Sequence, residues 1–411
     1  MYSERLFYFC SMESITLFDD PAYRGSLLPF TFTRPVAEIR VGILKISEKW
    51  EKYLGKEAGF FTQDYLKEKF PMKQGGSLFI NGGLCPDQGL ITAIKSLQKG
   101  TAIFKDQTLL AAYIEKPESF TIDEVKNQNK TEHFEGDITL IHRNWHIFQH
   151  NALELRKDFV LLTTNRTSKG VNDPHTAVYN PGMVFVEEGA QIRAAVLNAE
   201  DGPIYIGKNA HVQEGALIKG PFALCEGSTV NMGGKMRGDS TIGPYSKVGG
   251  EVSNSVIFGY SNKGHDGFMG NTVVGEWCNF GADTNISNLK NNYAPVKVWD
   301  YTKGGFTNTG LQFCGLMMGD HAKCGINTMF NTGTVVGVGA NVFGDGFPRN
   351  FIPSFSWGGA AGFSTFQFNK FEDTALKVME RRGFAFDQTE KALLQKVFDM
   401  TKAYRIWDKD V

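Results

Sequence analysis

The stretch IGKNAHVQEGALIKGPFALCEGSTVNMGGKMRGDSTIGPYSKV, residues 206–248, carries an apolar residue at every sixth position. These apolar residues are Ile206, Val212, Ile218, Leu224, Val230, Met236, Ile242 and Val248. The spacing resumes over Phe268–Ile286 and over Met318–Val342, and Gly often follows the apolar residue. A helix repeats about every 3.6 residues and a strand about every 2, whereas hexapeptide repeats with small residues at the corners are typical of a parallel β-helix. The pattern therefore predicts a β-helix over residues 184–346, with about nine coils of ~18 residues.

Length and charge set the broad class. With 411 residues, the chain exceeds what one hydrophobic core usually serves, so several domains are expected. Its 43 Lys and Arg balance 44 Asp and Glu, and this balance favours neither a nucleic-acid surface nor a membrane surface. We predict an open, Rossmann-like α/β domain over residues 12–170, the β-helix domain over 180–350 and a helical cap over 360–411.

Cysteine usage and the N-terminus bear on the compartment. Six Cys are scattered without CxxC spacing, and reduced thiols in a cytosolic protein are the plainest interpretation. The N-terminus lacks the continuous apolar region of a signal peptide, and no run approaches the ~20 apolar residues of a transmembrane helix. We expect a cytoplasmic protein without a membrane segment. Residues 1–11 look detached from the first expected strand, so Met12 is a candidate natural start.

Alternating strand and helix patterns before residue 164 predict the α/β sheet. The expected strands are Ser14–Asp19, Ser77–Asn81, Thr101–Phe104, Leu109–Glu115 and Phe159–Thr163. The expected helices are Val36–Trp50, Asp87–Leu97 and residues 144–160, with a polar surface insertion at 116–135. After Gly346, amphipathic helices over Phe371–Arg382 and Glu390–Arg405 are expected to cap the open end of the coil stack.

Two irregular stretches, residues 250–267 and 286–313, interrupt the hexads, and insertions in repeat proteins often carry the binding function. His265 lies in the first stretch. A His with a pKa near ~6.5 can take a proton from an amine at neutral pH, and backbone N–H groups at Gly corners can stabilise an oxyanion. A lone His is more simply interpreted as a surface loop residue, so the surrounding motif has to decide.

That motif is GHDGFMGNTVVGEWCNFGADTNISNLKNN, residues 264–292, and it resembles the acetyltransferase part of the bifunctional GlmU family. The resemblance implies a left-handed β-helix, a homotrimer, and acetyl-CoA bound between neighbouring coils. It matches His265 to the base that deprotonates the glucosamine amine and Asn288 to a contact with the sugar phosphate. It also places Asn279 near the amino sugar and Asn327 in a coil that lines the CoA cleft.

The sequence departs from the family pattern in two places. Leu289 stands where the family has Tyr, and the long insert over residues 295–313 has no simple counterpart. A sugar phosphate needs positive charge, for which Lys263 is the first candidate, followed by Lys235, Arg237 and Lys290. Each of these is more simply interpreted as a solvated surface charge.

The N-terminal segment LFDDPAYRGSLLPFTFTRPVAEIRVGILKI, residues 17–46, together with INGGLCP at 80–86, resembles a divergent nucleotidyltransferase domain. This domain type belongs to an alternative GlmU-like group of Bacteroidetes-type bacteria. The positive charge that phosphoryl chemistry requires is available from Arg24, Arg34, Arg40 and Lys45. Asp19 and Asp87, with Asp20, are candidate Mg²⁺ ligands. A Gly-rich phosphate loop is not visible, and Glu38 with Arg40 can also be interpreted as a structural ion pair.

The resemblance implies two activities in sugar-nucleotide and cell-envelope biosynthesis. One is acetyl transfer from acetyl-CoA to a hexosamine phosphate such as glucosamine 1-phosphate. The other is nucleotidyl transfer from an NTP such as UTP to a sugar 1-phosphate, giving UDP-N-acetylglucosamine or a similar nucleotide sugar. Two alternatives stay open, namely a monofunctional nucleotidyltransferase with an oligomerising β-helix, and a non-catalytic sugar-nucleotide sensor.

Overall fold

The computed structural model describes residues 14–114, 120–128 and 130–408, so Cys10 and the candidate start Met12 lie outside the described residues. Contacts group the chain into two units. The N-terminal unit holds the described residues up to 25, 34–39 and 44–142, and the β-helix unit holds 26–33, 40–43 and everything from 143. The segment 143–167 therefore packs with the β-helix.

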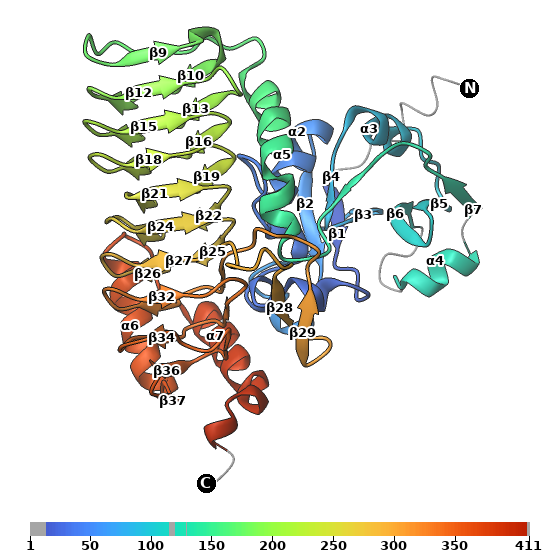
Figure 1. Ribbon diagram of the computed structural model, residues 1–411. Helices are drawn as coiled ribbons and strands as arrows, with labels where there is room; N and C mark the ends of the chain where they lie inside the picture. The colour runs from blue at the N-terminus through green and yellow to red at the C-terminus, as the bar shows by residue number, and fades with distance from the viewer. Residues whose placement is uncertain (1–13, 115–119, 129, 409–411) are drawn as a thin grey trace. The chain divides into compact units, whose positions relative to one another are not determined.

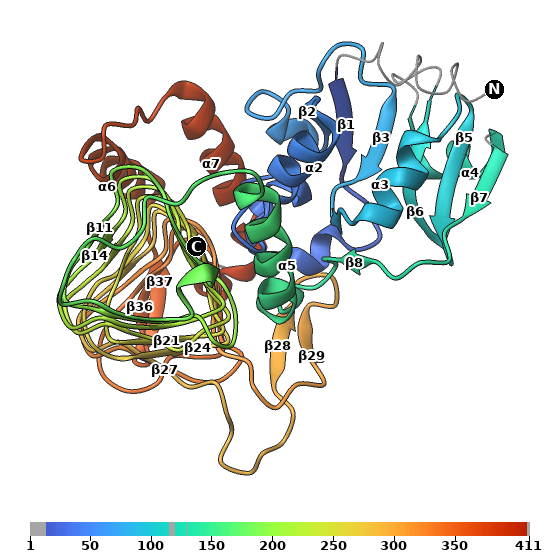
Figure 2. The same ribbon diagram turned by 90° about the horizontal axis from the view of Figure 1, so that it is seen from above.

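The N-terminal unit is built on a six-stranded mixed sheet with the order β2-β1-β3-β6-β5-β7 (Figure 2). Its strands are β1 (Ser14–Phe18), β2 (Glu57–Phe61), β3 (Leu78–Asn81), β5 (Thr101–Lys105), β6 (Thr108–Tyr113) and β7 (Lys130–His133). β1 pairs in parallel with both β2 and β3, whereas β6 is antiparallel to β3 and β5. The helices are α2 (Ile46–Leu54), α3 (Gln88–Lys95) and α4 (Ile122–Gln128), and β4 (Leu84–Cys85) pairs with β8 (Thr139–Leu140). The predicted α/β sheet is confirmed.

The predicted helix over Val36–Trp50 is wrong. Only a short 3-10 turn forms at Val36–Glu38, and the α-helix begins at Ile46. Gly42 between them has a positive φ of 78°, which a right-handed helix excludes. In the β-helix unit, the N–H of Gly42 donates to Asn151 Oδ1 (2.8 Å), so a side chain replaces the helical hydrogen bond.

The β-helix unit stacks its coils around three sheets, and Figure 1 shows the coils one below another. Face 1 consists of β10 (Val184–Val186), β13 (Ile204–Ile206), β16 (Phe222–Leu224), β19 (Ser240–Ile242), β22 (Val256–Gly259), β25 (Val273–Glu276), β30 (Met317–Met318), β33 (Val335–Val336) and β35 (Phe351–Ile352). Face 2 consists of β11 (Gln191–Ile192), β14 (His211–Val212), β17 (Thr229–Val230), β20 (Lys247–Val248), β23 (Asn262–Lys263), β26 (Asn279–Phe280), β31 (Lys323–Cys324), β34 (Asn341–Val342), β36 (Ser356–Gly359) and β37 (Gly362–Thr365). Face 3 consists of β9 (Ala177–Tyr179), β12 (Val196–Asn198), β15 (Leu217–Lys219), β18 (Lys235–Met236), β21 (Glu251–Ser253) and β24 (Phe268–Gly270), and the pair β27 (Asn285–Ile286) and β32 (Met329–Phe330) follows β24.

The six-residue spacing places its aliphatic side chains inside the coils, as predicted. All eight residues from Ile206 to Val248 are at most 2% exposed and share one core with Val274, Phe280, Ile286 and the run from Met318. Phe268 is an error of one position, because its neighbour Met269 fills the core. The stretch 250–267 is also a coil rather than an interruption, with β21, β22 and β23 in register with the coil before it.

The turns between face 1 and face 2 each contain a residue with positive φ. This column comprises Gly189, Asn209, Gly227, Tyr245, Tyr260, Trp277, His321, Gly339 and Phe355. Non-Gly residues rarely adopt this conformation, so packing has to hold them there. The rings of Tyr245, Tyr260, Trp277 and His321 stack in succession, with centroid distances of 5.7, 4.4 and 6.2 Å.

Three helices pack on the β-helix within its unit. α5 (His146–Thr163) is bonded to face 1 through Asn151, which donates to Thr241 Oγ1 (3.1 Å), and it continues through the strand predicted at Phe159–Thr163. Phe355 at the last coils contacts Phe371 of α6 (Phe368–Glu380) and Phe398 of α7 (Gln388–Met400). The predicted C-terminal helices are thus present. No helix among the described residues has both the length and the apolar character to cross a membrane.

We expect the inward positions to dominate stability. Ile242→Ala removes a fully buried side chain and should lower the free energy of unfolding by about 2–5 kcal/mol. Lys247→Ala, at an exposed position on the following strand, should change it by less than about 0.5 kcal/mol. Urea unfolding of both variants measures this difference, and equal effects would contradict the inward assignment.

Candidate functional site

His265 lies on the turn Gly264–Gly267, which joins β23 of face 2 to β24 of face 3. Its side chain is exposed, as is that of Asp266. A residue two coils earlier supports the turn, because Asn231 Nδ2 donates to the Gly264 carbonyl (2.7 Å). The imidazole therefore stands on an anchored corner.

Lys263 holds the same turn from inside the coil. It pairs in register with Val248, an inward core residue, and is 1% exposed. Its ammonium donates to the carbonyls of His265 (2.7 Å) and Asp266 (3.0 Å). Burial lowers the pKa of Lys263 from 10.5 to about 8. Lys263 is thus placed to fix the backbone beneath His265, and the structure does not present it as a surface contact for a sugar phosphate.

The three predicted Asn residues lie on different parts of the neighbouring coils. Asn288 follows β27 and donates from Nδ2 to Asn271 Oδ1 (2.8 Å), one coil back. Asn279 is exposed on face 2, and its Oδ1 accepts from Asn262 Nδ2 (3.5 Å). Asn327 sits with a φ of 54° in the turn between β31 and β32. His265 therefore lies at the edge of face 3 next to face 2, whereas Asn288 lies at the edge of face 3 next to face 1.

A pocket of about 710 Å³ runs along the turns between face 2 and face 3. Its walls come from successive coils and comprise Asp283, Asn285, Gly325, Ile326, Asn327, Met329, Phe343, Gly344, Asp345 and Gly346. The His265 turn belongs to the same column of turns, because a Cβ built on Gly267 would meet the Thr284 carbonyl at 2.2 Å. Asn285 connects the pocket to the His265 turn, because it lines the pocket and its Oδ1 accepts from the N–H of Phe268, the residue after the turn (2.9 Å). The volume falls in the ~300–1,000 Å³ range of small-molecule sites.

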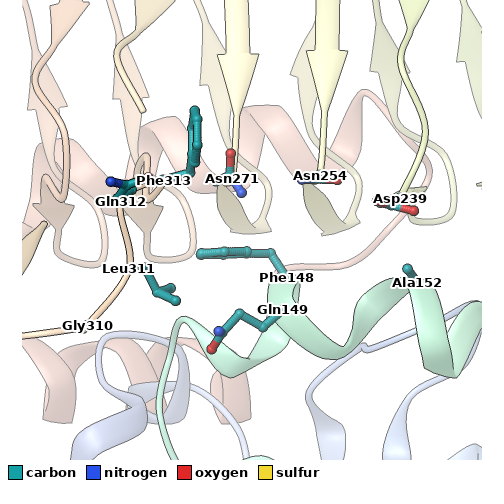
Figure 3. A pocket seen from close by; sticks show the side chains of 10 residues that line it. All are labelled: Phe148, Gln149, Ala152, Asp239, Asn254, Asn271, Gly310, Leu311, Gln312 and Phe313. Carbon is teal, nitrogen blue, oxygen red and sulfur yellow. The ribbon is translucent and has the colours of Figure 1, made fainter. Parts of the chain in front are cut away.

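A second pocket, of about 400 Å³, lies between α5 and the turns that join face 3 to face 1 (Figure 3). Asn271, the partner of Asn288, lines it together with Asn254 and Asp239 of the preceding turns. Phe148 of α5 and Phe313 at the end of the insert supply aromatic walls. The hydrogen bond to Asn271 thus connects Asn288 to this second pocket.

The candidate site of the N-terminal unit is the carboxyl edge of its parallel strands. The chain passes from β1 to β2 on one side and then to β3 on the other, so the strand order reverses at β1. Ligands of open α/β sheets bind outside the carboxyl ends of the strands at such a reversal. Asp19 follows β1, Thr62 follows β2 and Asn81 ends β3, which brings polar residues to this edge.

Asp19 is the centre of a buried network at this edge. One carboxylate oxygen accepts from the Val36 N–H (2.7 Å), and the other accepts from Arg24 Nε (3.0 Å) and Thr62 Oγ1 (2.5 Å). Arg24 also donates to the Tyr65 hydroxyl (3.2 Å). Burial raises the pKa of Asp19, although Arg24 acts in the opposite direction. The expected strand Ser77–Asn81 points to Asn81, whereas Thr62 follows a strand that is not predicted from the sequence. Tyr65 lies in the short 3-10 helix Asp64–Leu66 and has no signal of its own.

Three further residues predicted from the sequence, Arg40, Lys45 and Asp87, bind partners outside this network. Arg40 belongs to the β-helix unit, where its Nε donates to the Phe258 carbonyl (3.0 Å). Lys45 pairs with Glu38 (2.8 Å). Asp87 caps α3 by accepting from the Leu90 N–H (2.9 Å). Arg34 is buried in the N-terminal unit.

The metal prediction can be tested on the oxygen atoms at this edge. Among the residues that the structure describes, no three His, Cys, Asp or Glu side chains form a metal-binding group. Both Asp19 oxygens accept hydrogen bonds, and Asp87 serves as a helix cap. Asp20 fits an ion better, because its Oδ1 accepts from the Ala22 N–H alone (2.9 Å) in the described part of the chain.

The chain is similar to a family model and to several known proteins. Residues 15–167 match the family model described as sugar nucleotidyl transferase. The chain is 30% identical over 168 residues to a bifunctional sugar-1-phosphate nucleotidylyltransferase/acetyltransferase of Sulfurisphaera tokodaii, covering 40% of this chain and 39% of that protein. It is 33% identical over 118 residues to the bifunctional protein GlmU of Methanocaldococcus jannaschii (29% and 26%). It is 27% identical over 153 residues to an uncharacterized acetyltransferase, YaiX, of Escherichia coli (36% and 66%).

These matches cover only part of the chain and of its relatives. The N-terminal part of the chain is similar to sugar nucleotidyl transferases over residues 15–167. The predicted resemblance to GlmU-like bifunctional proteins is confirmed. The matched region spans less than half the length of the first two relatives.

The buried ammonium of Lys263 should be visible in the pH dependence of stability. Its pKa in the folded state, about 8, lies below its ordinary value of 10.5. Between these values the unfolded chain binds more protons than the folded one, so the free energy of unfolding should rise with pH. Lys263→Met should show a smaller rise than wild type in urea unfolding across this window.

Lys247→Met is the matched control, because Lys247 lies on the same face but points outward. The control should keep the wild-type pH dependence. A Lys263→Met variant with an unchanged rise would mean that the ammonium is not buried in solution.

Proposed function

We propose that the chain is a bifunctional transferase that makes an acetylated nucleotide sugar. The β-helix unit transfers an acetyl group from acetyl-CoA to the amine of a hexosamine 1-phosphate. The N-terminal unit transfers a uridylyl group from UTP to the sugar 1-phosphate, so the product is UDP-N-acetylglucosamine. The observation that carries the proposal is the exposed His265 on an internally anchored turn, in the column of turns that lines the 710 Å³ pocket.

In the acetyl transfer, the amine nitrogen attacks the thioester carbonyl of acetyl-CoA. His265 accepts the amine proton, a new C–N bond forms, and the C–S bond breaks as coenzyme A leaves. The pocket along the turns with Asn285 and Asn327 would hold the coenzyme A arm. Asn279 and Asn288 are proposed contacts of the amino sugar phosphate. By analogy with the family the working assembly is a homotrimer.

In the nucleotidyl transfer, a phosphate oxygen of the sugar 1-phosphate attacks the α-phosphorus of UTP, and pyrophosphate leaves. Arg24 lies at the strand reversal where nucleotides bind in open sheets, and Arg34 belongs to the same unit. Their positive charge would offset the charge on the transferred phosphoryl group. Mg²⁺, with Asp20 as the proposed ligand, would supply further charge neutralisation.

Replacing His265 by Gln keeps the size of the side chain and removes its basic nitrogen. We expect the release of coenzyme A from acetyl-CoA with glucosamine 1-phosphate to fall by about 10²- to 10⁴-fold. Pyrophosphate release by the N-terminal unit should be unchanged. His211→Gln is the control, because His211 is also exposed but lies in strand β14 of face 2 rather than on a turn between face 2 and face 3. If the wild type releases no coenzyme A with any amino sugar phosphate, the acetyltransferase assignment fails.

Asp20→Asn tests the N-terminal site. It removes the charge proposed to hold Mg²⁺, so pyrophosphate release from UTP and a sugar 1-phosphate should fall by at least about 10²-fold. Coenzyme A release should persist. Asp106→Asn changes an exposed Asp of the same unit and should retain both activities. Absence of pyrophosphate release in the wild type, with UTP or dTTP and a panel of sugar 1-phosphates, would favour the sensor alternative instead.

A further inference from the structure

The insert after β27 contains a two-stranded hairpin, β28 (Lys297–Asp300) and β29 (Gly305–Asn308), seen in orange in Figure 1. Opposite residues of an antiparallel pair share a face, so Lys297 and Asn308 lie on the same side as Trp299 and Phe306. The alternate residues Val298 and Asp300 are buried. The hairpin therefore has an inner face and a second face that carries a cation and two aromatic rings.

This second face packs against the last coils of the β-helix. The Trp299 ring stacks on Phe351 of β35, with centroids 4.1 Å apart and planes 8° from parallel. Phe306 meets Trp299 edge-on at 5.5 Å. Between the hairpin and the coils lies a pocket of about 580 Å³, which we call the hairpin pocket. It is lined by Lys290, Lys297, Phe306, Thr332, Arg349, Asn350 and Phe351.

The hairpin pocket is strongly cationic. Lys290, Lys297 and Arg349 line it, and no carboxylate does so among the described lining residues. Lys290 Nζ donates to the Pro295 carbonyl (3.0 Å), which orients the ammonium without neutralising its charge. By contrast, Asp239 lines the pocket beside α5, and Asp283 and Asp345 line the pocket along the turns. Like charges gathered in a concavity concentrate the field and attract anions.

The walls of the hairpin pocket are held in place without a ligand. Phe351 belongs to β35, which pairs in parallel with β33 through Val335. Asn350 Nδ2 donates to the Thr332 carbonyl (2.7 Å), linking two successive coils. A site that is already ordered loses little entropy when it binds.

We propose that the hairpin pocket binds a nucleoside phosphate. Lys297 and Arg349 would bind the phosphates, and Arg can do so with two parallel hydrogen bonds. The base would stack on the exposed ring of Phe306 or on Phe351, because every base has a flat face that an aromatic ring can cover. The 3′-phospho-ADP part of coenzyme A and a UDP-sugar share this chemistry. The site does not depend on the catalytic assignments above.

Photolabelling of the full chain with 8-azido-ADP tests the proposal. Peptides that contain Phe306 or Phe351 should be labelled, and labelling should decrease by at least tenfold in the double variant Lys297→Glu, Arg349→Glu. Both replaced side chains are exposed, so the fold should be kept, which urea unfolding checks. Lys303→Glu is the matched control, because it reverses a charge on the same hairpin outside the pocket and should label like wild type.

Competition identifies the source of the ligand. Protection by coenzyme A or by UDP-N-acetylglucosamine would each support the proposal and name the natural occupant, and protection by unlabelled ADP alone would support it for nucleotides in general. The proposal is overturned if these peptides are not labelled in wild type, or if no competitor protects them. It is also overturned if the double variant labels as strongly as wild type, or if Lys303→Glu loses as much label.

Discussion

The β-helix depends on one constraint, which is that each coil must return its backbone into register beneath the previous one. Parallel pairing such as Val230 with Val248 fixes this register for every face. The turns between face 1 and face 2 satisfy this constraint with a residue of positive φ. That residue need not be Gly, since Tyr260 and Trp277 adopt the same backbone conformation. Stacked rings offset the strain at those two positions. Turns therefore align in columns, and side chains from distant sequence positions become neighbours along one edge.

Lys263 shows how this constraint is used at the candidate site. The coil that ends at Lys263 is short, since Lys263 follows its partner Val248 by 15 residues, and a Lys occupies the inward position. A buried ammonium is costly unless it is hydrogen-bonded, and here the partners are the carbonyls of His265 and Asp266. The core thus gives up an aliphatic side chain and gains an anchor for the turn that presents His265.

The sequence predicts the repeat well because the apolar residues at the six-residue spacing are the ones whose side chains are buried inside the coils. The positions from Ile206 to Val248 and from Met318 to Val342 are correct, whereas Phe268 is misplaced by one position because the inward residues Met269 and Val274 are five residues apart rather than six. The sequence treats Lys263 as a surface charge, since a lone Lys carries no signal of its inward direction. The roles of the N-terminal charged residues are harder to predict, because Arg24 and Arg40 look equivalent in the sequence but belong to different units. The strand reversal at β1, which selects Arg24 and Asp19, is a property of sheet order that no local pattern encodes.

The two departures from the regular repeat lie on different columns of turns. The short coil leads into the turn from face 2 to face 3, where His265 stands, whereas the insert leaves after β27, between face 3 and face 1. The hairpin and its cationic pocket consequently adjoin the end of the stack through Thr332 and Phe351, and they share no lining residue with the pocket along the turns. A change in the insert can therefore alter ligand binding at its own edge without moving the Lys263 anchor. That separation allows the insert to vary while the corner that carries His265 is kept.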